Sequence, residues 1–160
     1  MSDFYQIDPT RHSLGRTLID WLGQVQTFPH AINNKWTALD VCPLDDSPRP
    51  LSSYAGILIP PNVSLPERCY FGCANYFPPG GGMGWHTDSH RPGWRIYVYR
   101  LFSGRAAFHY NNTIIVENEG IGGYVFRTGF DCWHAIETNG SRISFGLKID
   151  DEMMTEIVSA

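Results

Sequence analysis

Hydrophobic positions follow two patterns along the chain, one helical and one extended. Over residues 10–26 apolar side chains recur every three or four positions, which predicts an amphipathic helix. The apolar stripe consists of Leu14, Leu18, Ile19, Leu22 and Val25. Thr10 or Ser13 can serve as the N-cap, and Phe28-Pro29 ends the helix because proline cannot continue it.

After this helix, short apolar or aromatic runs alternate with Pro, Gly, Asn and Asp, which is typical of β-strands separated by turns. The runs are Trp36–Cys42, Ala55–Ile59, Arg68–Phe77, Trp94–Phe102, Ala106–Tyr110, Thr113–Val116, Gly123–Thr128, Cys132–Thr138 and Arg142–Ile149. Asn111-Asn112 lies between two runs and predicts a tight hairpin. This many short strands with one helix predict a mainly β sandwich or jelly roll.

Length and composition are those of one globular domain. The chain has 160 residues, 42% hydrophobic and 18% charged, which is enough for one core but too few for two domains. We therefore predict a single domain over residues 1–160, with an N-terminal helical segment (1–30) and a β core (31–149). The tail (150–160) is expected to form a short helix or to fray. The Pro-rich segment Pro43–Pro50 is expected to be an exposed loop and is a candidate lid.

Charge and terminal sequence argue against several classes of protein. A net charge of −4 does not favour general binding to nucleic acid or to an anionic membrane. The first residues lack the features of a signal peptide, and no stretch has the roughly 20 apolar residues that span a bilayer. The four cysteines lack the C-x2-C spacing of zinc knuckles and fit reduced thiols. We expect a cytoplasmic protein with no membrane partner; the sequence does not indicate an oligomeric state.

A candidate metal site combines His86 and Asp88 with the distant His134. On an extended backbone, side chains two residues apart point to the same face, so His86 and Asp88 can reach one ion. Two imidazoles and a carboxylate on one face of an octahedron leave the other positions open, as in non-haem Fe(II) oxygenases. A structural zinc site would be closed by four ligands. The simpler alternative is a buried polar network without metal.

Several motifs between residues 68 and 149 together resemble the Fe(II)/2-oxoglutarate-dependent oxygenase superfamily. They are Pro78-Pro79-Gly80-Gly81-Gly82-Met83-Gly84-Trp85-His86-Thr87-Asp88, Gly123-Tyr124-Val125-Phe126, and His134 followed by Arg142-Ile143-Ser144. The resemblance implies a double-stranded β-helix with Fe(II) bound by His86, Asp88 and His134. It also implies that 2-oxoglutarate and O2 are cosubstrates, and that oxidative decarboxylation to succinate is coupled to hydroxylation of a substrate C–H bond.

The same resemblance suggests residues that bind the cosubstrate. By position, Arg142 would pair with the distal carboxylate of 2-oxoglutarate, and Ser144 would be its hydroxyl partner. A planar guanidinium can bind a carboxylate through two parallel hydrogen bonds, which favours Arg142 on chemical grounds as well. Tyr76 resembles the cosubstrate tyrosine of prolyl-hydroxylase-like members, and Asn75 resembles an asparagine of the nucleic-acid dealkylase branch. The rival candidates for the tyrosine contact are Tyr97 and Tyr99.

Arg142 must share the inward face with His134, which constrains the turn between them. We predict a hairpin with a three-residue loop, 139–141, with Gly140 near the left-handed conformation. This register pairs Thr138 with Arg142 and turns Arg142 and Ser144 inward. It turns the alternate residues outward, where the N-terminal helix can cover them; these residues are Ile143, Phe145 and Leu147.

The motifs do not fix the substrate, and two branches of the superfamily compete. The prolyl-hydroxylase-like branch, which acts on a protein side chain or an amino acid, suits the small size, the acidic net charge and Tyr76. The dealkylase branch is favoured by residues 83–88, by Asn75 and by residues 142–148. That last segment is similar to R-x-N-x-T-x-R, with serine and lysine replacing the asparagine and the second arginine. We expect 2-oxoglutarate and a peptide or amino-acid substrate as partners, with nucleic acid as the alternative.

Other interpretations remain beside this one. His90 or His109 could replace a ligand, although His90 follows Asp88 closely and His109 lies in an aromatic run. A basic streak follows the H-x-D motif and is either solvated surface or the mouth for an acidic substrate; it consists of Arg91, Arg95, Arg100 and Arg105. An alternative of another class is a cupin-like metal-binding β-barrel, such as an isomerase or a module without catalysis.

Overall fold

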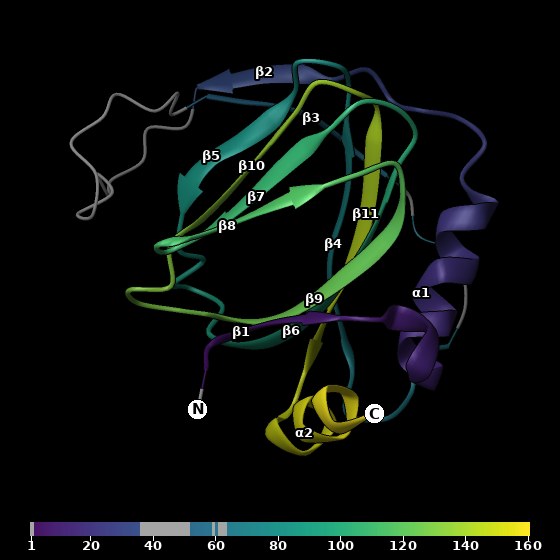
Figure 1. Cartoon of the computed structure of the whole chain (residues 1–160), viewed down its shortest axis with the longest axis vertical. Coiled ribbons are helices and arrows are strands. Elements are labelled where there is room, and N and C mark those ends of the chain that lie inside the picture. The colour runs from purple at the N-terminus through teal and green to yellow at the C-terminus, as the bar shows by residue number, and fades with distance from the viewer. Residues whose placement is uncertain (1, 36–51, 59, 61–63) are drawn as a thin grey trace.

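One antiparallel sheet curls on itself so that its two halves face each other (Figure 1). The computed structural model describes residues 2–35, 52–58, 60 and 64–160, and eleven strands lie within these ranges. The first half-sheet contains β1 (Phe4–Ile7), β9 (Gly120–Thr128), β6 (Gly93–Leu101), β11 (Arg142–Ile149) and β4 (Tyr70–Phe77). The second half-sheet contains β5 (Gly82–His86), β10 (His134–Thr138), β7 (Ala106–Tyr110) and β8 (Thr113–Glu117). β3 (Ser52–Ile57) pairs with both halves and also with β2 (Ile32–Lys35). The predicted mainly β, double-stranded β-helix architecture is confirmed.

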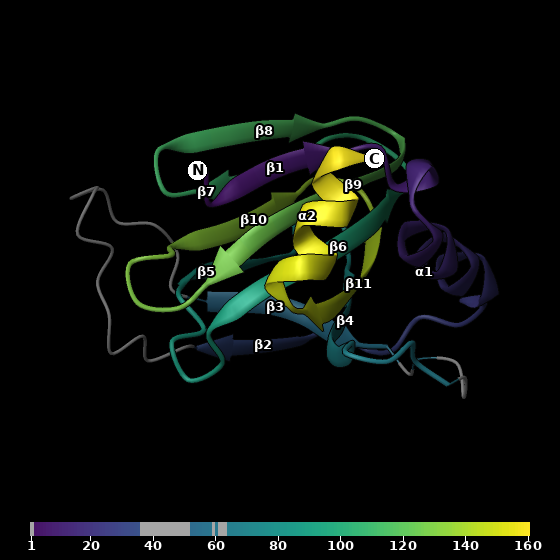
Figure 2. The same cartoon turned by 90° about the horizontal axis from the view of Figure 1, so that it is seen from below.

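Helix α1 (Ser13–Gln24) packs on the outer face of the first half-sheet, as predicted. Its buried Leu18 and Leu22 belong to the same core as Ile143, Phe145 and Leu147. Each such side chain stabilises the fold by about 1.5–3 kcal/mol through removal from water. The second helix, α2 (Asp151–Ser159), is the expected short C-terminal helix and lies against β6 and β1 (Figure 2).

The N-cap of α1 differs from both predicted residues. A 3-10 turn, η1 (Pro9–Arg11), precedes the helix and is itself capped by Asp8. The cap of α1 is His12, whose Nδ1 accepts a hydrogen bond from the Leu14 amide at 3.1 Å. The predicted start at residue 10 is early because the pattern of apolar residues does not distinguish a 3-10 turn from the first turn of an α-helix.

Between the two half-sheets lies an aromatic interior. Phe108 of β7 stacks on Tyr124 of β9 with ring centroids 4.7 Å apart. Tyr97 of β6 lies against Gly146 of β11, where an added Cβ would be 3.1 Å from the tyrosine ring and 2.8 Å from Cys73 Sγ. Glycine at this position therefore makes room for Tyr97 inside the barrel.

The predicted hairpin between β10 and β11 is wrong, although its consequence for side-chain direction is confirmed. β10 pairs with β5 and β7, whereas β11 pairs with β4 and β6, so residues 139–141 cross between the half-sheets. Gly140 does not have a positive φ. It is needed because a Cβ there would collide with the backbone oxygen of Ser103. Arg142 and Ser144 point inward and are fully buried, as expected.

Most predicted strands are present within a few residues of their expected ends. The Asn111 hairpin is confirmed, because Tyr110 pairs with Thr113 and Asn111 has φ of 47°. The sequence does not predict β1, β2 or β5. In β5 the glycines Gly82 and Gly84 interrupt the apolar pattern that would indicate a strand. The predicted strand Trp36–Cys42 and the candidate lid Pro43–Pro50 lie outside the described residues. No helix among the described residues is long and apolar enough to cross a membrane.

Candidate metal centre

His86, Asp88 and His134 converge at one point at the end of the β5–β10 pair. His86 and His134 are direct neighbours across these strands, and their ring centroids are 4.2 Å apart. Asp88 Oδ2 lies 3.3 Å from His134 Nε2 and 3.8 Å from His86 Nε2. One potential ligand atom from each residue lies within 4.8 Å of the others. The three predicted ligands are therefore within reach of a single ion.

Asp88 reaches this point by a different backbone route from the one expected. β5 ends at His86, and Asp88 has a φ of 54°, in the left-handed region, rather than an extended conformation. Aspartate is among the residues that tolerate this conformation. The Arg91 amide donates a hydrogen bond to the Asp88 carbonyl at 2.9 Å, which closes the turn. A turn, not strand alternation, brings the carboxylate beside His86.

Both imidazoles are oriented by hydrogen bonds to their own backbone. His86 Nδ1 lies 2.6 Å from the Gly84 carbonyl oxygen, and His134 Nδ1 lies 2.9 Å from that of Cys132. A carbonyl oxygen can only accept, so each Nδ1 carries the proton and each Nε2 keeps its lone pair. Metal-binding histidines are usually held in this way, with the second nitrogen fixing the tautomer and the ring direction.

The charge states also suit a cation. Burial, together with the neighbouring His134, lowers the pKa of His86 to about 4, so that this imidazole is neutral at neutral pH. Burial would raise the pKa of Asp88, but its contacts with His134, His86 and Arg95 outweigh this effect and lower the pKa below its usual value. Neutral imidazole and ionised carboxylate are the forms that bind metals.

The shift of His86 predicts a pH dependence for the stability of the metal-free protein. The pKa of His86 is near 6.5 in the unfolded chain and about 4 in the folded protein. Between these two pH values His86 is therefore protonated in the unfolded state and neutral in the folded state. The unfolded state then binds more protons, so the free energy of unfolding should decrease by up to about 3 kcal/mol as the pH falls through this range. Asp88 contributes only at lower pH, because its lowered pKa gives stability that is lost below about pH 4.

Urea denaturation at pH 7.5, 6, 5 and 4.5 measures this effect. The variant His86→Gln should show a flatter profile than the wild type. His30→Gln, at an exposed histidine outside the site, is the matched control and should leave the profile unchanged. Equal profiles for the wild type and His86→Gln would contradict the prediction.

A cavity of about 170 Å³ adjoins the three residues inside the barrel. Its apolar wall is made by Phe77, Met83, Phe108 and Phe126. Its polar wall includes Asn75, Arg91, Arg95 and Tyr97. Arg95 is buried and donates from Nη1 to Asp88 Oδ2 at 3.2 Å, while its Nε has no hydrogen-bond partner among the described residues. The cavity therefore presents a buried cation beside the candidate metal position.

Of the residues predicted to bind the cosubstrate, some line the cavity and others do not. Asn75 lines the cavity, whereas Tyr76 points to the outer face and stacks on Phe28 with ring centroids 4.8 Å apart. Neighbouring residues of a strand face opposite sides, so Asn75 and Tyr76 cannot both serve the cavity. The expectation that Tyr76 lies beside the cosubstrate does not fit its position. Of the three candidate tyrosines, Tyr97 lines the cavity, and its hydroxyl lies 2.6 Å from Ser144 Oγ.

Arg142 faces the interior but is already paired. Its Nε and Nη2 donate to the two carboxylate oxygens of Glu117 at 2.6 and 2.8 Å, and both side chains are fully buried. Tyr124 also donates to Glu117, at 2.8 Å. Burial would lower the pKa of Arg142, but the charge of Glu117 more than offsets this and raises it. Neither Arg142 nor Ser144 lines the metal cavity.

Sequence reasoning missed the roles of Arg95 and Glu117. The sequence places Arg95 in a basic streak that is either solvated surface or the mouth for an acidic substrate, although its alternation with Tyr97 and Tyr99 could have assigned it to the inner face. Glu117 ends an apolar run and gives no local signal, because its partner is 25 positions away. The rival ligands do not join the site: His90 is exposed at the cavity, and His109 lies 3.4 Å from Glu137 and packs near Trp85.

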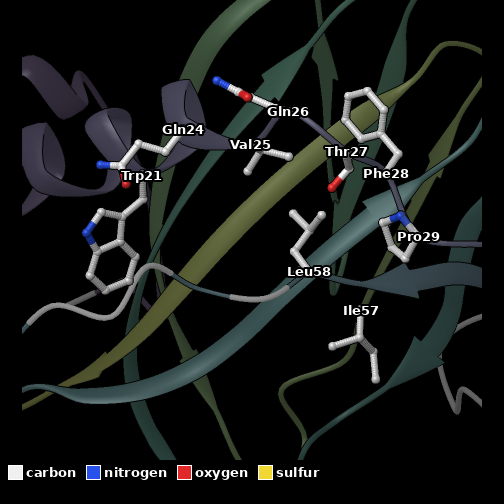
Figure 3. A pocket seen from close by; sticks show the side chains of 9 residues that line it. All are labelled: Trp21, Gln24, Val25, Gln26, Thr27, Phe28, Pro29, Ile57 and Leu58. Carbon is white, nitrogen blue, oxygen red and sulfur yellow. The ribbon is translucent and has the colours of Figure 1, made fainter.

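A second cavity, of about 290 Å³, lies outside the barrel beside the end of α1 (Figure 3). The described residues that line it carry no ionisable group; they are Trp21, Gln24, Val25, Gln26, Thr27, Phe28, Pro29, Ile57 and Leu58. These residues offer no metal ligand and no acid–base group.

Comparison with solved structures finds several chains of similar fold. No family model and no curated protein matches the chain. The chain is similar to a cupin 2 conserved barrel domain protein from Salinispora arenicola, with 15% identity over 67% of this chain and 83% of that chain and a TM-score of 0.36. It is also similar to the Cnp3 cupin domain of Schizosaccharomyces pombe, with 15% identity over 82% of this chain and 92% of that chain and a TM-score of 0.34. Similarities this low carry no argument about function, which has to be inferred from the site.

Proposed function

We propose that the protein is an Fe(II)- and 2-oxoglutarate-dependent dioxygenase that hydroxylates a C–H bond of a second substrate. The observation that carries this proposal is the convergence of His86, Asp88 and His134 beside a cavity, with both imidazole Nε2 atoms directed at the carboxylate. Two histidines and one carboxylate are the ligand set typical of non-haem Fe(II) oxygenases.

The donor set fits iron better than a structural zinc ion. Among the described residues no fourth His, Cys, Asp or Glu joins the group, so the set would leave coordination positions open toward the cavity. A structural zinc site is closed by four protein ligands. Bound Fe(II) with an oxo-acid cosubstrate would supply O2 activation, which no side chain of the chain can provide.

The remaining residues of the cavity supply orientation and charge. Arg95 holds the Asp88 carboxylate and offers a buried cation to an anionic cosubstrate. Asn75 and Tyr97 add polar groups, while Phe108 and Phe126 form an apolar wall that limits the entry of water. This arrangement supports binding of a small oxo acid next to the metal ligands.

For the second substrate we favour a protein side chain or a free amino acid. The cavity is small, and the net charge of −4 does not attract a nucleic-acid backbone. A nucleic-acid dealkylase remains the alternative within the superfamily. A cupin-like metal-binding module without catalysis is the alternative of another class, and the pairing of Arg142 with Glu117 favours it, because this guanidinium was expected to hold the cosubstrate.

Succinate formation tests the proposal. Protein loaded with Fe(II) should convert 2-oxoglutarate to succinate in air, and a pool of peptides should stimulate the conversion more than methylated single-stranded DNA. Asp88→Ala should show no conversion. Stimulation by methylated DNA alone would reassign the protein to the dealkylase branch. Tightly bound zinc without succinate would refute the dioxygenase proposal in favour of the binding module.

A further inference from the structure

A buried ion pair lies in the barrel interior, next to the metal cavity but not lining it. Arg142 of β11 and Glu117 at the end of β8 belong to opposite half-sheets and form two parallel hydrogen bonds. The Arg142 guanidinium lies 4.8 Å from the Tyr99 ring centroid, and Tyr124 donates to the Glu117 carboxylate. The chain therefore supplies its own carboxylate to the fully buried Arg142.

This pair lies directly behind the wall of the metal cavity. Phe77 and Tyr97 line the cavity, and their ring centroids are 5.7 and 5.6 Å from Arg142 Cζ. Arg142 Nη1 is buried and has no hydrogen-bond partner among the described residues. A ligand at the metal position would reach this nitrogen only by displacing the ring of Tyr97 or Phe77, and Glu117 would still hold the other two donors.

A second carboxylate at Arg142 would meet an unfavourable electrostatic environment. The Arg142–Glu117 pair is neutral as a unit, so another anion beside it would lie near the negative charge of Glu117 in a site of low dielectric. Displacing Glu117 is also costly, because its carboxylate is buried and would lose its partner. A carboxylate at this position therefore gains less than it would from an unpaired arginine.

We propose that Glu117 competes with the distal carboxylate of the cosubstrate for Arg142 and thereby determines which 2-oxo acid the site prefers. This inference rests on the proposed function. The 2-oxo acid head would bind at the metal ligands beside Arg95, whereas the far end of the molecule would gain little from a carboxylate. Glu117 is a specificity-determining residue that reduces the advantage of 2-oxoglutarate over a 2-oxo acid with an uncharged end.

Anaerobic titration calorimetry of the Fe(II)-loaded protein tests this inference by binding alone. The two ligands are 2-oxoglutarate and 2-oxopentanoate, which has a methyl group where 2-oxoglutarate has its distal carboxylate. The wild type should bind both with dissociation constants within about threefold of each other. In Glu117→Gln the affinity for 2-oxoglutarate should rise by about tenfold or more, because Arg142 regains a free charge, while that for 2-oxopentanoate stays unchanged.

Two further variants keep the test decisive. Glu119→Gln removes an exposed carboxylate two residues away and should behave as the wild type. The double variant Glu117→Leu with Arg142→Met removes the pair as a unit and should bind 2-oxoglutarate within about threefold of the wild type. It reports on the inference even where Glu117→Gln does not fold.

The outcomes separate this inference from the proposed function. An unchanged ratio of affinities in Glu117→Gln, or a strong preference of the wild type for 2-oxoglutarate that the double variant abolishes, would overturn the inference alone. Failure of both 2-oxo acids to bind the metal-loaded wild type and Glu117→Gln would overturn the proposed function, and the inference with it.

Discussion

Replacing His86 with alanine should lower the affinity for Fe(II) by about 100-fold or more and abolish succinate formation. The expected loss is large because a ligand itself is removed, whereas losing only the hydrogen-bond partner behind a ligand already costs about 10–100-fold. His86 is one of three converging donors, and the remaining two cannot hold the ion on one face. Metal titration of the apo-protein, followed by calorimetry, measures the change.

His90→Ala is the matched control for this experiment. His90 lines the same cavity but lies outside the group of three, so its variant should keep the wild-type metal affinity. The circular dichroism spectrum of His86→Ala should match that of the wild type, because the strands around the site pair through their backbones. Wild-type metal affinity in His86→Ala, or its loss in His90→Ala, would refute the ligand assignment.

Replacing Arg142 with methionine should lower the free energy of unfolding by about 3–5 kcal/mol, because it leaves Glu117 buried without a charged partner. The double variant Glu117→Leu with Arg142→Met should recover most of this loss, since a buried ion pair can often be replaced by apolar side chains at little cost. Urea denaturation of the wild type and the two variants measures both effects.

An exposed ion pair provides the comparison. Arg127 lies 3.5 Å from Asp3, and both side chains are about half exposed. Arg127→Met should change the free energy of unfolding by at most about 1 kcal/mol, as is typical of surface pairs. A loss in Arg142→Met as small as that in Arg127→Met would show that the Arg142–Glu117 pair is not buried in solution.

The candidate metal ligands could be predicted from sequence because their signal is carried by residue type and short spacing. The inward direction of Arg142 was also predictable. Side chains alternate along a strand, so Arg142 must face the side opposite to Ile143, Phe145 and Leu147, which α1 covers. The pairing of β10 with β5 and β7 was not, because it depends on contacts between distant segments. The same limit explains the unexpected left-handed conformation of Asp88, which is set by the turn to Arg91.

Two of the residues predicted to bind the cosubstrate show how far a local sequence pattern can be used. Alternation excludes Asn75 and Tyr76 from the same face, but only the stacking of Phe28 on Tyr76 shows which of them points outward. The role of Glu117 depends on a partner in the opposite half-sheet, which local sequence does not reveal.

Near each end of β6 a buried ion pair connects the two half-sheets, and the two pairs differ in their composition. Arg95 and the Arg142 neighbour Leu101 are six residues apart on this strand, about 20 Å. At the Leu101 end, the Arg142–Glu117 pair joins the half-sheets without any external group. At the Arg95 end, Asp88 joins Arg95 of the first half-sheet to the two histidines of the second. The Arg95–Asp88 ion pair is therefore the contact that joins the half-sheets at this end, so any widening of the mouth for a substrate would act on Asp88, one of the three candidate ligands.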